Sequence, residues 1–82
     1  MAAPETLDAL GLKCPLPVLR ARKRLLAMPP GAVLRVRADD PVAVIDLPNF
    51  CREAGHELLE ITPAPKGAHD FLIRRACATG AP

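Results

Sequence analysis

The chain has 82 residues, half of them hydrophobic, and a formal net charge of +2. This length predicts one small domain over residues 1–82, with an ordered core at about 6–76. The sequence contains no Ser, Trp, Tyr or Gln and only scattered glycines, which excludes a serine-nucleophile hydrolase and a glycine-rich phosphate loop.

Strand and helix patterns alternate in the first part of the chain. Residues 6–13 predict a short strand, and residues 15–28 predict a helix that Pro29-Pro30-Gly31 ends. At about 100° per residue, the buried face of this helix collects Cys14, Val18, Ala21, Leu25 and Met28. Its exposed side collects Leu16, Arg20, Lys23 and Arg24.

The remaining chain predicts a strand, a second helical region and two further strands. Residues 32–38 alternate as a half-buried strand, and residues 41–54 predict a helix that is kinked or divided in two at Pro48, with Asp46 as a candidate second cap. The apolar face of this helix collects Leu47, Phe50, Cys51 and Ala54. Two strands follow, joined as a hairpin; they span residues 56–62 and 70–76.

The order β-α-β-α-β-β is typical of a layered α/β fold. Right-handed crossovers between parallel strands place both helices on one face of the sheet. The other face is expected to be open and to carry Arg35, Arg37 and Arg74.

Cys14-Pro15-Leu16-Pro17 occupies the predicted strand-to-helix junction. Two prolines suit a first helical turn and hold Cys14 at the N-cap, beside the positive end of the helix dipole. That position, the neighbouring Lys13 and the arginines that follow predict a lowered thiol pKa, and with it a stabilised thiolate or persulfide anion. The alternative is a small apolar side chain that closes the core.

The other two cysteines receive different interpretations. Cys51 is expected to pack in the core, and Cys77 is an exposed bystander that is open to oxidation. The spacing of the three cysteines contains no C-x-x-C pair, so we expect neither a disulfide framework nor a metal or other cofactor. No base partner for Cys14 is visible, since His56 and His69 are interpreted as surface or strand-end residues. These features favour a carrier of a reactive group that does not turn over alone.

Several segments resemble the TusA/SirA-type sulfur carrier proteins, whose signature is Cys-Pro-x-Pro. They are LDALGLKCPLP at 7–17, ADDP at 38–41, DLPNFC at 46–51, GHEL at 55–58 and FLIR at 71–74. The resemblance implies a two-layer α/β sandwich with a mixed four-stranded sheet. It also implies that Cys14 accepts sulfane sulfur as a persulfide from a cysteine desulfurase or rhodanese, and passes it to an acceptor protein.

Charge is divided unevenly along the chain. Residues 1–37 hold seven basic and two acidic side chains, a net of +5, whereas residues 38–82 hold four basic and seven acidic ones, a net of −3. This division predicts an acidic partner near the first half, or else an ordinary solvated helix face. We assign partner docking to a set of exposed residues on the first helix, namely Leu16, Arg20, Lys23 and Arg24.

Leu16 departs from the acidic residue that family members serving tRNA thiolation often carry. The resemblance therefore leaves the pathway open between tRNA thiolation, sulfur oxidation, molybdenum-cofactor supply and general sulfur trafficking.

Two alternatives from other classes remain. One is a small nucleic-acid-binding module that uses Arg35, Arg37 and Arg74, although the low net charge argues against stable nucleic-acid binding. The other is a redox-responsive adaptor that senses oxidation at Cys14. The N-terminus lacks a signal-peptide pattern and no apolar run reaches membrane-spanning length. We therefore expect a cytoplasmic protein with reduced thiols and no membrane partner; the oligomeric state is left open.

Overall fold

The computed structural model describes residues 4–76. Four strands and two helices follow one another in the predicted order. Their bounds are β1 Glu5–Ala9, α1 Leu16–Leu26, β2 Val33–Ala38, α2 Ala43–Ala54, β3 Glu57–Pro63 and β4 His69–Arg74. A short 3-10 turn, Pro65–Gly67, lies between β3 and β4.

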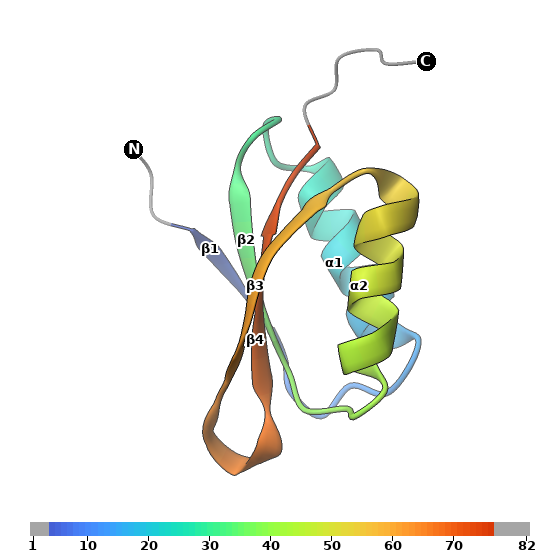
Figure 1. The fold of residues 1–82 in the computed structure, drawn as a ribbon, viewed down its shortest axis with the longest axis vertical. Coiled ribbons are helices and arrows are strands. Elements are labelled where there is room, and N and C mark those ends of the chain that lie inside the picture. The colour runs from blue at the N-terminus through green and yellow to red at the C-terminus, as the bar shows by residue number, and fades with distance from the viewer. Residues whose placement is uncertain (1–3, 77–82) are drawn as a thin grey trace.

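The strands form one mixed sheet in the order β1-β2-β4-β3. β1 runs parallel to β2, whereas β4 is antiparallel to both β2 and β3. Both helices lie on the same face of this sheet, next to each other (Figure 1). The predicted two-layer α/β sandwich is therefore confirmed, and β1 and β3 are its edge strands.

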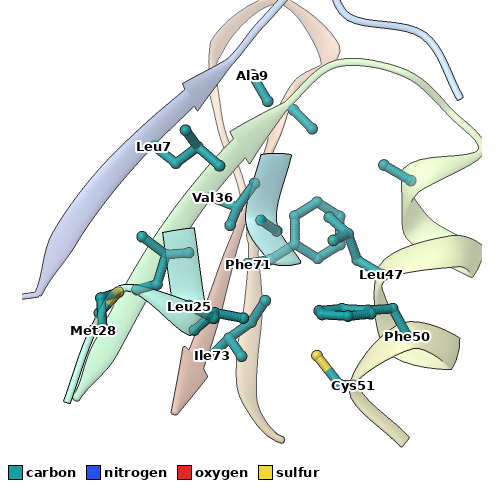
Figure 2. Close-up of a cluster of buried hydrophobic side chains, with 14 residues drawn as sticks. Leu7, Ala9, Leu25, Met28, Val36, Leu47, Phe50, Cys51, Phe71 and Ile73 are labelled. Atoms are coloured by element: carbon teal, nitrogen blue, oxygen red, sulfur yellow. The ribbon is translucent and has the colours of Figure 1, made fainter. Parts of the chain in front are cut away.

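The core fills the space between the sheet and the helices (Figure 2). Strand alternation supplies fully buried side chains such as Leu34, Val36, Phe71 and Ile73. Of the face predicted for the first helix, Ala21, Leu25 and Met28 are buried and Val18 is partly buried. Cys14 does not belong to the core, because its side chain is exposed.

Two element boundaries next to Cys14 differ from the prediction. β1 ends at Ala9, because the Asp8 carboxylate accepts a hydrogen bond from the Leu10 N–H and the chain then turns at Gly11, whose φ is +79°. α1 starts at Leu16 with Pro15 as its N-cap, so Cys14 precedes the cap, and the Cys14–Pro15 peptide bond is cis.

The predicted division of this helix at Pro48 is wrong, since α2 is one continuous helix of 12 residues. A proline inside a helix removes a backbone hydrogen bond, and Leu47, Phe50 and Cys51 on either side of it are buried in the core. Asp46 lies in the first turn of this helix and does not cap a second part.

The open face of the sheet carries paired charges. Arg37 forms two hydrogen bonds with Asp70, at 2.8 and 3.0 Å, and Arg74 contacts Glu57 at 2.9 Å. The guanidinium of Arg37 lowers the pKa of Asp70. Two of the three arginines proposed for phosphate binding are thus already engaged by carboxylates.

Candidate functional site: the Cys14 loop

The loop between β1 and α1 carries Cys14 and is held from the other side by the β2–α2 connection. The Asp40 carboxylate, only 8% exposed, accepts hydrogen bonds from the backbone N–H of Cys14 at 2.7 Å and of Val42 at 3.2 Å. Asp39 accepts a third bond, from the Gly11 N–H at 3.0 Å. These contacts fix the backbone of Cys14 relative to the start of α2.

The thiol of Cys14 points toward α2. Its Sγ donates a hydrogen bond to Oδ2 of Asp46, with 2.9 Å between the two atoms. This bond raises the pKa of Cys14, and desolvation by the neighbouring protein and the negative charges of Asp46 and Asp40 act in the same direction.

The predicted lowering of the thiol pKa is therefore wrong in direction. The prediction counted the α1 N-terminus, Lys13 and the arginines that follow, all of them close to Cys14 in the sequence. The carboxylates of Asp40 and Asp46 reach the loop from 26 and 32 residues away. Their hydrogen bond and charges raise the thiol pKa, and the cap of α1 lies one residue beyond the thiol.

Asp46 is the site residue that the sequence interpretation missed. It was considered only as a helix cap, and no partner for Cys14 was identified. The available signal was that Asp46 opens one of the segments resembling the sulfur carriers. The two histidines do not serve as that partner: His56 accepts a hydrogen bond from the Ala76 N–H at 2.9 Å, and the ring of His69 lies against that of Phe71.

The residues that flank Cys14 in the signature have separate positions. Pro17 is buried beneath the first turn of α1, whereas Pro15 and Leu16 are exposed. The carbonyl of Lys13 accepts the Leu16 N–H at 2.8 Å, which closes the turn around Cys14 and Pro15.

A surface groove of about 320 Å³ adjoins the thiol between α1 and α2. We call it the acidic groove, because Asp46 and Glu53 are its charged residues. Its lining consists of Pro15, Val18, Asp46, Asn49, Phe50 and Glu53.

A second groove, of about 420 Å³, lies on the other flank of α1, against β1. We call it the basic groove; its lining consists of Leu7, Arg20, Lys23, Arg24 and Ala27. It brings together the three cations predicted for docking, and Arg24 also contacts Glu5 at 3.2 Å. Leu16 does not line it, but is 42% exposed at the start of the same helix.

The other cysteines differ from Cys14. Cys51 is 2% exposed, and burial raises its pKa to about 11. Cys77 lies outside the described residues.

Within residues 4–76, no three His, Cys, Asp or Glu side chains are arranged to hold a metal ion. No helix in the same range is long and apolar enough to cross a bilayer.

Residues 5–75 match the family model described as sulfurtransferase TusA. The chain belongs to the TusA family. Its relatives include the sulfur carrier protein TusA of Allochromatium vinosum, with 47% identity over 72 residues that cover 88% of this chain and 93% of that protein.

The fold is also similar to that of a solved SirA-like protein. The crystal structure of a SirA-like protein from Desulfitobacterium hafniense superimposes with a TM-score of 0.77 at 30% identity, covering 87% of this chain and 96% of that one. The resemblance drawn from the sequence is thereby confirmed. A role for this TusA-family chain as a sulfur carrier follows, and a carrier requires a donor and an acceptor.

Proposed function

We propose that this TusA-family carrier holds its sulfur on Cys14, as a persulfide. The observation that carries the proposal is an exposed thiol on a loop whose backbone is fixed by the buried Asp40 carboxylate. An exposed sulfur at the edge of a small domain can enter the active site of a larger partner. Cys51, by contrast, is enclosed by the core.

The transfer needs no oxidant or reductant. Cys14 sulfur attacks the terminal sulfur of a donor persulfide, and a new S–S bond forms on Cys14. The donor's S–S bond breaks, and its electron pair stays on the donor sulfur, which takes up the proton that Cys14 releases. Delivery to the acceptor thiol is the same exchange in the opposite sense.

The donor is of the cysteine desulfurase or rhodanese type, and the acceptor is a second protein. Docking is assigned to the basic groove and to the exposed Leu16. Arg20, Lys23 and Arg24 converge in that groove, which supports a partner with an acidic surface. At about 1.5 Å per residue, Lys23 lies roughly 10 Å along α1 from Leu16, so one partner spans both.

We place the relay in the cytoplasm, where thiols remain reduced. Both Cys14 and Cys51 are free thiols, in keeping with that compartment. The carrier then serves tRNA thiolation, sulfur oxidation or general sulfur trafficking, and Leu16, exposed where tRNA-thiolation members often carry an acid, is the residue with which to distinguish these acceptors.

Intact-mass analysis tests the persulfide site directly. The protein is incubated with a cysteine desulfurase and cysteine, and we expect one added sulfur atom, mapped to Cys14. Cys14→Ser should lose it completely, whereas the control Cys51→Ala should keep it. Sulfur found only at another residue, or no loading from any sulfane donor, would overturn the assignment.

A further inference from the structure

The unloaded thiol of Cys14 is a hydrogen-bond donor, and its acceptor is a carboxylate. A thiol has one proton to donate, and an ionised carboxylate only accepts. The 2.9 Å separation between Sγ and Oδ2 of Asp46 therefore places the thiol proton between these two atoms. Loss of that proton would leave two negative charges in contact.

The pair is held in place by the fold. Asp40 bonds both the Cys14 N–H and the Val42 N–H, and Val42 is the N-cap of the helix whose first turn contains Asp46. The thiol and the carboxylate therefore belong to two backbone segments that share one buried anchor. The contact does not depend on a flexible surface side chain finding its partner.

The charged groups around Cys14 are mainly acidic. Asp46 contacts the thiol and Asp40 contacts its backbone, while Asp39 is bonded to Gly11 of the same loop. Glu53 lies further along the acidic groove. Lys13 is the basic neighbour in the chain, and the pKa of the thiol is nevertheless raised.

We propose that Asp46 controls the protonation of Cys14, and that its carboxylate holds the proton on the unloaded thiol. The thiolate is the nucleophilic form of cysteine, so the unloaded carrier rests in its unreactive state. An exposed thiol is thereby protected from alkylation and oxidation until a sulfur donor binds. The consequence for sulfur transfer rests on the persulfide function proposed above, but the protonation itself does not.

In the transfer step, the proton has a defined path. As the Cys14 sulfur bonds to the donor's terminal sulfur, its proton moves to Oδ2 of Asp46, the atom that already accepts its hydrogen bond. The departing donor thiolate then takes the proton from Asp46. Thiol, persulfide and carboxylate balance without a further reactant.

The test is the rate of alkylation of Cys14 by iodoacetamide as a function of pH, followed by mass spectrometry. In the wild-type protein we expect the midpoint to lie above about 8.5, the value of a free cysteine. In Asp46→Asn we expect a midpoint lower by about one pH unit, as befits the loss of an adjacent like charge. Alkylation near pH 7 should become several-fold faster.

Glu53→Gln is the matched control, because it removes one negative charge from the same groove without touching Cys14. Its midpoint should shift far less than that of Asp46→Asn. Asp46→Ala provides a second variant, with thermal unfolding as the check that each protein is folded. An unchanged or higher midpoint in the Asp46 variants, or a wild-type midpoint below 8.5, would overturn the inference.

The outcome is independent of sulfur loading. If the midpoint shifts as expected but no sulfur is ever found on Cys14, the persulfide assignment fails and the control by Asp46 stands. If sulfur loads on Cys14 but the midpoint does not move, the persulfide assignment stands and the control by Asp46 fails.

Discussion

Helix α1 separates two grooves that differ in charge and in their relation to the thiol. The basic groove, against β1, gathers Arg20, Lys23 and Arg24, whereas the acidic groove, against α2, contains Asp46, which contacts Cys14 directly. Charges in the first groove act over a distance on an approaching partner, and those in the second act on one proton. In the roles proposed above, attracting a partner and holding the thiol proton therefore belong to different sides of the same helix.

Removing the Asp40 carboxylate should have the largest effect, a loss of folding stability. It would also free the Cys14 loop from the start of α2, beside the acidic groove. Asp40→Ala leaves two backbone N–H groups without their buried acceptor. We expect the free energy of unfolding in urea to fall by about 2–4 kcal/mol, because hydrogen bonds to a charged group are the stronger kind and unpaired groups add a cost.

Asp39→Ala is the control for that variant, since it removes a single, exposed hydrogen bond to Gly11. Its loss should stay below about 1 kcal/mol. Equal losses in the two variants would show that Asp40 does not anchor the loop.

Charge reversal in the basic groove should have the next largest effect. The triple variant Arg20→Glu, Lys23→Glu, Arg24→Glu should lower the association rate with the sulfur donor by about tenfold at low salt, through the loss of electrostatic steering. Stopped-flow measurements of binding would provide the rate. The alkylation midpoint of Cys14 should change little.

The single variant Arg22→Glu is the control, because Arg22 is exposed on α1 but does not line the basic groove. Compared with single reversals at Arg20 or Lys23, it should slow association less. If reversals at Arg20 or Lys23 slow association no more than Arg22→Glu does, the basic groove is an ordinary solvated face and not a docking site.

His56 should produce a third, smaller effect, on how the free energy of unfolding depends on pH. This effect distinguishes a pH-dependent loss of the fold from the titration of the Cys14 thiol. Burial and the charge of Arg75 lower the pKa of His56, whose Nδ1 accepts the Ala76 N–H. The contribution of this group is therefore complete above an unfolded pKa of about 6.5 and is lost as the pH falls through the lower folded value.

Urea unfolding between pH 5 and 7.5 should thus show stability falling by about 1 kcal/mol toward acid, as expected for one hydrogen bond. His56→Gln should flatten this dependence. Since the effect lies on the acid side, it does not overlap with the titration of Cys14, whose pKa is raised. A loss of stability toward alkaline pH in this window would contradict the assignment.

Salt should produce the smallest change at the thiol and sharpen the comparison of the two grooves further. At about 1 M ionic strength the screening length is about 3 Å, so steering by the basic groove is largely suppressed. The direct contact between Cys14 and Asp46 is screened much less. We expect association to slow with added salt while the alkylation midpoint moves by only a few tenths of a pH unit; parallel changes in both would contradict the division of roles.

The sequence predicted those features that depend on local periodicity. The exposed side of α1, with Arg20, Lys23 and Arg24, follows from helical phase alone, and the alternation in residues 32–38 matches the burial pattern of β2. The contact between Cys14 and Asp46 joins residues 32 positions apart. No local rule connects them, because their meeting depends on how the two helices pack on the sheet.

The same limit explains the two clear errors. The pKa of Cys14 was predicted from its sequence neighbours, whereas distant carboxylates set its direction. Pro48 was predicted to break a helix that core contacts keep continuous. In both cases a tertiary contact outweighed a local preference.

Asp40 has a consequence for how members of such a family can diverge. Its hydrogen bonds run to the main chain of residues 14 and 42 and involve no side chain of the loop. These bonds therefore place no requirement on the side chain at position 16. A substitution of Leu16 would change the surface beside the thiol while leaving the hydrogen bonds that position the Cys14 backbone intact.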